Sequence, residues 1–175
     1  MNAAINMIPE VISDFNVYED GTKLIGVSGE VELPTLESMK ETISGAGIAG
    51  EYETVIPGHF SPISMDIPFE MLSVPVVKLY SKGSVSLTLR GSQQCRDVAT
   101  GTVEHKKLRV VVTGTPTALK FGKVAKTKKT ASGVTVQVLR YELYIADEEA
   151  IVLDKKAYVF RVFGEDMLAP IRANI

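Results

Sequence analysis

The sequence is poor in cysteine and histidine, and it has no long apolar run. It contains one cysteine and two histidines. The single cysteine, Cys95, excludes an internal disulfide and indicates a reducing compartment. No run approaches the roughly 18 apolar residues of a membrane helix, so we expect no membrane binding by the chain itself. The first residues, MNAAINMIPEVISDF, lack a basic region and a long apolar core, so no secretion signal is expected.

An excess of one charge sign is also lacking. The formal net charge is −2, from 19 basic and 21 acidic side chains. This balance indicates neither nucleic acid nor an anionic membrane as a partner. Five lysines nevertheless gather in residues 120–129, namely Lys120, Lys123, Lys126, Lys128 and Lys129. Phe121 is the one aromatic residue among them, which favours a solvated hairpin tip or a charged contact with another chain over specific nucleic-acid binding.

Side chains that commonly carry catalysis are few and poorly grouped. A hairpin turning at residues 100–101 would place Cys95 opposite Glu104 or His105, the one arrangement suited to a nucleophile. No helix N-terminus or oxyanion-hole turn accompanies it to lower the thiol pKa. The favoured interpretation is a strand-end cysteine beside a surface histidine, and His59 is expected in a loop. We therefore predict that the chain is not an enzyme.

Two other motifs give weak indications of a ligand. Asp147, Glu148 and Glu149 adjoin one another, but three acids in a hairpin turn are usually solvated, and a metal site needs three or four clustered ligands. The run GAGIAG at residues 45–50 has the letter spacing of a dinucleotide fingerprint, yet it follows no parallel strand and opens no helix. We expect neither a bound metal nor a cofactor.

Strand-forming patterns are abundant. The longest covers residues 133–147, GVTVQVLRYELYIAD, whose valines and tyrosines suit a pleated sheet. Val134, Val136 and Val138 share one face, whereas from Leu139 the apolar residues occupy the other. This change of phase predicts either a β-bulge near Val138 and Leu139 or a strand half covered on both sides.

Similar patterns predict strands at residues 15–19, 22–33, 63–71, 84–98, 103–113 with a continuation toward 121, and 151–163. Asp20-Gly21 indicates a hairpin turn. Pro68 indicates an edge strand or a bulge. Ser73 and Pro75 predict the start of a short helix. The expected fold is mainly β: an antiparallel β-sandwich or half-barrel with one short helix and a long glycine-containing loop.

We interpret residues 1–14 as an N-terminal arm and residues 15–175 as one domain containing a long loop at 34–58. Leu36, Met39 and Ile43 have the spacing of a helical turn, but the following glycines disfavour a stable helix. Such long loops are uncommon unless functional. The loop's apolar residues and the unprotected strand edges predict a protein that assembles with other chains. The alternative is a soluble β-sandwich binding module.

Several short segments occur in an informative order. They are LPTL at 33–36, Glu41, GAGIAGE at 45–51, Arg90-Gly91, Thr100-Gly101, YEL at 141–143, and an ending with Asp166, Leu168, Arg172, Asn174 and Ile175. Their order and spacing resemble the major tail tube proteins of contractile-tailed bacteriophages and the related R-type bacteriocins. The resemblance runs from about Phe15 to the C-terminus.

The resemblance implies a structural protein of a virion tail or phage-tail-like particle, assembled in the bacterial cytoplasm. Hexameric rings would join their sheets into a β-barrel around a lumen and stack into the inner tube of a contractile tail. The implied partners are copies of the chain, the tail sheath, baseplate and tail-terminator proteins, with non-specific passage of DNA in a phage. Such a lumen wall should be neutral or acidic.

Within this arrangement the 34–58 loop is expected to be the stacking element. The predicted inter-ring and inter-subunit contacts are Leu36, Met39, Ile43, Gly45, Gly47, Ile48, Gly50, Glu51 and Arg172. We place the lysines of residues 120–129 outside the lumen, at either the ring-to-ring face or the outer, sheath-facing side.

Overall fold

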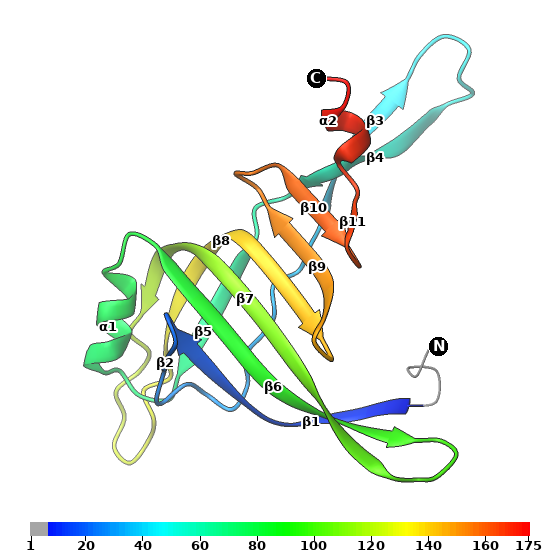
Figure 1. Ribbon diagram of the computed structural model, residues 1–175. Coiled ribbons are helices and arrows are strands. Elements are labelled where there is room, and N and C mark those ends of the chain that lie inside the picture. The colour runs from blue at the N-terminus through cyan, green and yellow to red at the C-terminus, as the bar shows by residue number, and fades with distance from the viewer. Residues whose placement is uncertain (1–6) are drawn as a thin grey trace.

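The fold consists almost entirely of antiparallel strands (Figure 1). The structure is a computed structural model that describes residues 7–175. The strands are β1 (Met7–Glu19), β2 (Thr22–Lys23), β3 (Ser38–Ser44), β4 (Glu51–Phe60), β5 (Ser64–Phe69), β6 (Val85–Asp97), β7 (Val103–Lys120), β8 (Ser132–Ile145), β9 (Glu148–Asp154), β10 (Val159–Val162) and β11 (Glu165–Asp166). The helices are α1 (Val74–Tyr80) and α2 (Ala169–Arg172).

The sheet is organised around β8. Nine strands form one sheet in the order β11-β10-β9-β8-β7-β6-β1-β2, with β5 paired to β8 outside this path. One edge of β8 pairs with β7 along nearly its whole length. Its other edge is shared, because β5 pairs with residues 132–137 and β9 with residues 140–145. The sheet therefore divides near Val138 and curves into an open half-barrel, which confirms the expected fold class (Figure 1).

The long strand β8 contains the bulge that its alternation predicts. Thr113 of β7 lies opposite Arg140, and the next residue, Gly114, lies opposite Val138. Leu139 is therefore the extra residue on β8. Val138 before the bulge and Tyr141 after it are both buried. The bulge thus keeps apolar side chains on the core face through the change of phase.

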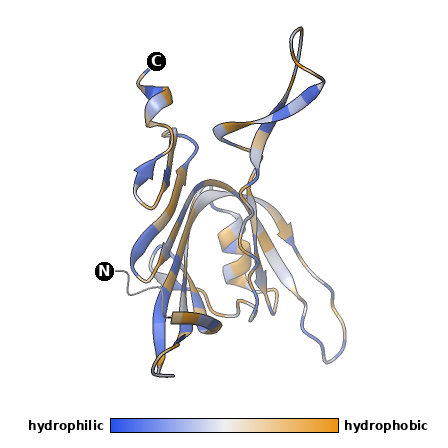
Figure 2. Cartoon of the chain, turned by 90° about the vertical axis from the view of Figure 1, so that its right-hand side faces the viewer, coloured by the Kyte–Doolittle hydropathy of each residue, from blue (hydrophilic) through white to orange (hydrophobic). Residues whose placement is uncertain are grey.

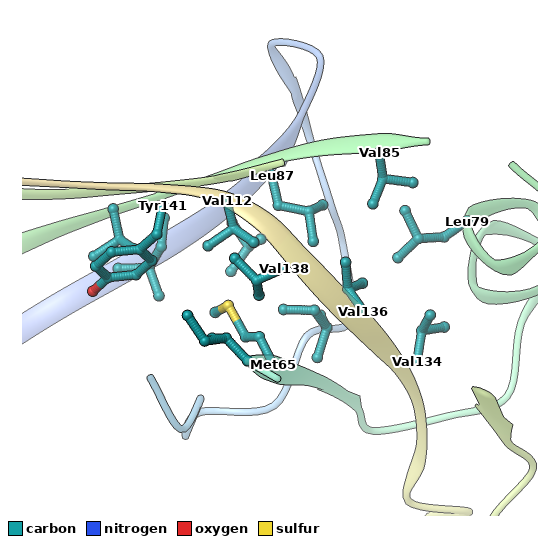
Figure 3. Close-up of a cluster of buried hydrophobic side chains, with 14 of the residues drawn as sticks. Met65, Leu79, Val85, Leu87, Val112, Val134, Val136, Val138 and Tyr141 are labelled. Atoms are coloured by element: carbon teal, nitrogen blue, oxygen red, sulfur yellow. The ribbon is translucent and has the colours of Figure 1, made fainter. Parts of the chain in front are cut away.

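The hydrophobic core lies on the concave face of the sheet, where α1 sits inside the arch (Figure 2). Val136 and Val138 of β8 meet Leu79 from α1 and Met65 from β5, together with residues of β6 and β7 (Figure 3). Removing each such side chain from water contributes about 1.5–3 kcal/mol. This cluster joins the two branches of the sheet and the helix into one body.

Helix α1 and strand β5 agree with the sequence predictions. Ser73 is the N-cap of α1, and Pro75 lies in the first turn. Val76 and Leu79, about one turn apart, are its buried residues. Within residues 7–175, β5 forms a ladder only with β8, so Pro68 lies on an edge strand as expected.

The N-terminal strand is longer than predicted. β1 begins at Met7 rather than Phe15 and pairs with β6, from Met7 opposite Asp97 to Glu19 opposite Leu87. The expectation of a loose arm was therefore wrong for residues 7–14. Two register shifts, at Glu10 and Ser13, break the alternation in this half of the strand and concealed it in the sequence. The rest of the expected arm, residues 1–6, lies outside the described residues.

The predicted strand over residues 22–33 is wrong beyond Lys23, because only the short β2 forms there. After β2 the chain follows an irregular path across the core, and Leu24, Val27 and Val31 pack against it. A single bridge joins Val27 to Phe69. The alternating pattern in this segment reflects packing of side chains rather than a ladder.

Residues 34–58 are not the long loop that the sequence predicted, and this expectation was also wrong. β3 and β4 form a two-stranded antiparallel sheet that pairs with no other strand in residues 7–175. The pairing runs from Ser38 opposite Phe60 to Ser44 opposite Glu51, so only residues 45–50 form the glycine-containing tip. Alternating threonine, isoleucine, tyrosine and valine favour strands, and this preference prevails over the helical spacing of the apolar residues.

Candidate assembly surfaces

The β3–β4 hairpin stands away from the body of the molecule (Figures 1 and 2). Several large apolar side chains on it are open to solvent: Tyr52 is 54% exposed, Val55 52% and Ile48 39%. An isolated two-stranded hairpin is at best marginally stable in water. Exposed apolar groups on such an element are typical of a surface that another chain covers.

Most of the contact residues predicted from the sequence lie on this hairpin. They are Met39, Ile43, Gly45, Gly47, Ile48, Gly50 and Glu51. Ile43 is paired with Tyr52, and Glu51 with Ser44. Leu36 lies before the hairpin and packs partly buried against the core. Arg172 is in α2, so the structure does not group all the predicted residues on one element.

The base of the hairpin packs against the C-terminal branch of the sheet. The rings of Phe60 and Phe160 meet edge to face with centroids 5.0 Å apart, and His59 meets Tyr158 in the same way at 5.9 Å. Such aromatic pairs contribute about 0.5–1.5 kcal/mol beyond their buried area. They fix the direction in which the hairpin leaves the body. His59, expected in a loop, instead lies in β4, where it is exposed and its ring contacts Tyr158.

Gly58 allows the closest contact at this base. Its φ angle is +72°, and a Cβ atom there would overlap the Cδ atoms of Leu168. Leu168 is itself 1% exposed. The Leu168 side chain thus occupies the space that a side chain at position 58 would need.

Replacing Gly58 with alanine is expected to destabilise the protein by about 1–3 kcal/mol, because both backbone strain and overpacking act at this site. Gly47→Ala is the matched control, since Gly47 also has a positive φ, +90°, but has no atom near the position of a Cβ. Urea unfolding of both variants measures the difference. Equal destabilisation by the two substitutions would show that the contact with Leu168 contributes nothing.

Arg172 fastens the C-terminal segment to the same branch. Its Nη1 donates a hydrogen bond to the carbonyl oxygen of Tyr158 at 2.8 Å, and its Nη2 donates to Asp166. Asp166 Oδ1 also accepts a hydrogen bond from the Leu168 backbone N–H at 3.0 Å. The guanidinium of Arg172 and then this N–H hold the pKa of Asp166 below its ordinary value.

This lowered pKa predicts that acid loosens the C-terminal segment. A carboxylate whose pKa falls on folding contributes stability above its unfolded pKa, about 3.9, and loses that contribution as the pH drops through the folded pKa. Amide hydrogen exchange of residues 165–175 is therefore expected to accelerate, relative to the core, below about pH 4. Asp166→Asn should abolish this acid dependence. The same acid dependence in Asp166→Asn would assign it to another group.

A second exposed apolar surface lies along β1. Residues 7–16 pair only with β6 within the described chain, so their other edge is open. Ile8 is 54% exposed, Val11 56% and Ile12 45%. Glu10, between them, accepts hydrogen bonds from Gln94 at 2.7 Å and Arg96 at 2.6 Å. An open edge with apolar side chains is a surface on which another strand can pair.

The lysine-rich residues 120–129 form the end of β7 and an exposed loop after it. Lys120 is paired with Asp66, and Lys129 with Glu70. Lys123, Lys126 and Lys128 are exposed and make no ion pair within residues 7–175. The loop also exposes Phe121 by 63% and Val124 by 95%. It therefore offers both free positive charge and apolar surface.

The face of the sheet opposite the core carries polar side chains of both signs. Arg90 and Arg109 are cross-strand neighbours, and like charges in such a position repel. Arg90 lies over the ring of Tyr18, with its Cζ 4.9 Å from the centroid, and Arg109 lies over Tyr144 at 4.0 Å. These cation–π contacts give each guanidinium a favourable partner of its own.

The residues weighed for catalysis are not brought together. Cys95 pairs with Glu104, but His105 pairs with Gln94, so the cysteine and His105 point to opposite faces of the sheet. His105 Nδ1 is instead within hydrogen-bond distance of the Ser92 hydroxyl, at 3.3 Å. Cys95 is buried, with Sγ 3.9 Å from the Gln93 carbonyl oxygen.

The acidic turn is likewise engaged with basic side chains. Asp147 accepts from Lys107 at 2.8 Å, and Glu149 accepts from Arg161 at 3.0 Å. The part of the chain that the structure describes holds no group of three potential metal ligands. Over the same residues, no helix is long and apolar enough to cross a membrane.

The structure adds contact candidates that the sequence prediction omitted. Tyr52 and Val55 of β4 are exposed beside the predicted hairpin residues, and the strand-favouring residue types in EYETVI were a signal for them. Ile8, Val11 and Ile12 were assigned to the arm. Their signal was a short apolar pattern, which the bulges in β1 disguised.

Comparison with known proteins agrees with an assembling β-protein. No curated protein matches the sequence. The family model described as phage tail tube protein FII matches residues 9–175, nearly the whole chain. The match covers the half-barrel, the projecting hairpin and the C-terminal segment together. The chain therefore belongs to the phage tail tube protein FII family.

Proposed function

We propose that the chain forms hexameric rings, which stack into the inner tube of a contractile phage tail or a phage-tail-like particle. Within a ring, neighbouring subunits join through the open edge of β1. Successive rings stack through the β3–β4 hairpin. The tube assembles in the bacterial cytoplasm, lies within a sheath, and meets baseplate and tail-terminator proteins. In a phage, DNA passes through its lumen.

Membership of the family makes the chain a structural component of the tail tube, which is part of the virion tail. The observation that carries the finer proposal is the hairpin, because nothing in residues 7–175 covers its exposed apolar side chains. Stacked rings supply that cover. Leu36 and Arg172 would then act indirectly, by holding the hairpin base and the C-terminal segment in place.

The face opposite the core is the proposed wall of the lumen. The core face is covered by α1 and β5, whereas the opposite face carries no layer of its own in residues 7–175. Its arginines have local partners: Arg90 and Arg109 lie over tyrosine rings, and Arg140 pairs with Glu142 at 2.6 Å. Glu142 and Asp154 offset the charge of Arg140, whereas the tyrosine rings leave the positive charges of Arg90 and Arg109 in place. Such a wall has mixed charge and would hold passing DNA less strongly than a uniformly basic wall.

Electron microscopy of the purified full-length protein tests the proposal. Negative-stain images at increasing concentration are expected to show rings with sixfold symmetry and then tubes, and light scattering should show a matching rise in mass. Compact monomers at every concentration, with and without a pre-formed tube end as a seed, would overturn the proposal. That result would favour the alternative of a soluble β-sandwich binding module.

A further inference from the structure

We propose that the lysine loop, residues 121–129, is the receptor for the β3–β4 hairpin of a second copy of the chain in the adjacent ring. This inference rests on the proposed function, since it requires rings that stack. It assigns the ring-to-ring face to the lysine loop and gives the hairpin a specific partner.

The hairpin carries an excess of acid on both of its faces. Residues 38–60 contain three glutamates, Glu41, Glu51 and Glu53, and one lysine, Lys40. Lys40 pairs with Glu53 at 3.2 Å, which leaves Glu41 and Glu51 without a basic partner in the described chain. Glu41 lies opposite Thr54 and Glu51 opposite Ser44, so both carboxylates project from the exposed part of the hairpin.

The lysine loop carries the complementary positive charge, and internal hydrogen bonds define its conformation. The Lys123 N–H donates to the Thr130 carbonyl oxygen at 2.7 Å, and the Lys128 N–H donates to Ala125 at 3.2 Å. At its two ends, Lys120 and Lys129 are already bound to Asp66 and Glu70. These contacts hold the neck of the loop and leave the other three lysines free for a partner.

The apolar parts of the two surfaces also correspond. Val124 is 95% exposed between Lys123 and Lys126, and Phe121 is 63% exposed at the neck. On the hairpin, Tyr52 and Ile48 are exposed beside Glu51. A contact between the two surfaces buries apolar side chains at its centre and pairs opposite charges at its rim, which is the usual anatomy of a protein interface.

The positions of the two surfaces suit a repeating contact. The hairpin projects from one end of the molecule and the lysine loop from the opposite end, in both views (Figures 1 and 2). A contact between two different patches on identical chains is heterologous, so it can repeat without limit along one direction. Subunits that keep one orientation and are displaced along the tube axis therefore bring hairpin and loop together.

Reversal of charge tests the contact directly. One variant carries Lys123→Glu, Lys126→Glu and Lys128→Glu, a second carries Glu41→Lys, Glu51→Lys and Glu53→Lys, and a third carries all six. Each triple variant should raise the protein concentration needed for tube formation by about tenfold or more, since attractions between exposed charges become repulsions. The sixfold variant should recover most of the loss. Tube formation by the wild type should also weaken as salt increases.

A matched control changes charge by the same amount elsewhere. Lys23→Glu, Lys78→Glu and Lys156→Glu alter three exposed lysines that make no ion pair in the described chain. This control should form tubes at the wild-type concentration. Circular dichroism and thermal unfolding of every variant establish that it is folded.

Several outcomes would overturn the inference, and they differ from a failure of the proposed function. Normal tubes from either triple variant, or no recovery in the sixfold variant, would show that the lysine loop does not bind the hairpin during stacking. Loss of DNA binding with normal tube formation in the lysine variant would assign the loop to nucleic acid instead. Absence of rings and tubes in the wild type would reject the proposed function itself.

Discussion

A chain whose hairpin is shortened to its base is expected to fold and to form no tubes. Lys40 and Val55 are paired, so a two-residue Asn-Gly turn can replace residues 41–54 and close the shortened hairpin in register. The removed residues pair only with each other in the described chain. Their loss should change the free energy of unfolding of the body by about 1 kcal/mol or less. The protein should remain β-rich by circular dichroism.

Assembly of this variant should fail because the removed part carries the proposed stacking contact. It carries Ile48 and Tyr52, whose exposure leaves them available to a neighbouring ring. Electron microscopy should show rings or single subunits at concentrations where the wild type forms tubes. A control that keeps the hairpin but replaces Ala46 and Ala49 with serine should assemble normally, because these tip residues are exposed and small.

Two other outcomes of the shortened chain would contradict this account. Tubes of normal length would place stacking on another surface, with β1 and the lysine loop as the remaining exposed candidates. A chain that does not fold would show that the hairpin contributes to the core. The aromatic contacts of Phe60 and His59 remain in the shortened chain, so such a failure would not come from the base.

Local chemistry determined much of the fold, and those parts were predictable. The change of phase near Leu139 left two alternatives, a bulge or a strand half covered on both sides, and the structure has the bulge, because a one-residue slip would otherwise turn apolar side chains to solvent. Ser73 and Pro75 predicted the start of α1. Pro68 predicted an edge strand, since proline cannot donate to a central ladder. Each of these signals lies within a few residues of the feature that it specifies.

Features that depend on distant pairing were not predictable in the same way. The first half of β1 exists because β6 extends beyond the core to pair with it, and the bulges at Glu10 and Ser13 removed the alternation that would have revealed it. β3 and β4 form because they pair with each other, whereas the helical spacing in one strand and the glycines of the tip suggested a loop. The division of β8 between β5 and β9 is likewise a matter of topology.

The candidate surfaces were also predictable only in part, because local sequence indicated some of their residues but not their conformation or position. The hairpin residues were predicted from their apolar and glycine content, although their conformation was not. Arg172 was included through resemblance, and the structure gives it a role inside the chain, bound to Tyr158 and Asp166. From the sequence, the lysine loop could lie either at the ring-to-ring face or on the outer, sheath-facing side. Its location at the end opposite the hairpin now favours the ring-to-ring face.

Lysines placed on the open edge of β1 are expected to prevent ring closure. Ile8→Lys with Val11→Lys puts two charges where the side chains are now 54% and 56% exposed. In the single subunit both lysines remain in solvent, so the free energy of unfolding should change by about 0.5 kcal/mol or less per site. In a closed ring they would enter a strand-to-strand contact, and charged residues on an edge strand oppose such pairing.

The measurement is the mass of the assembled species by light scattering, together with ring images. The double variant should remain monomeric at concentrations that give rings in the wild type. The control is Val74→Lys with Val77→Lys on α1, which also replaces two exposed apolar residues but lies near the C-terminal end of β1, away from the N-terminal half that carries the tested residues (Figure 1). Without sheath present, this control should form rings and tubes. Rings of normal symmetry from the β1 variant would show that lateral contacts use a different edge. Loss of rings in both variants would show that apolar surface in general, rather than the edge of β1, drives the association.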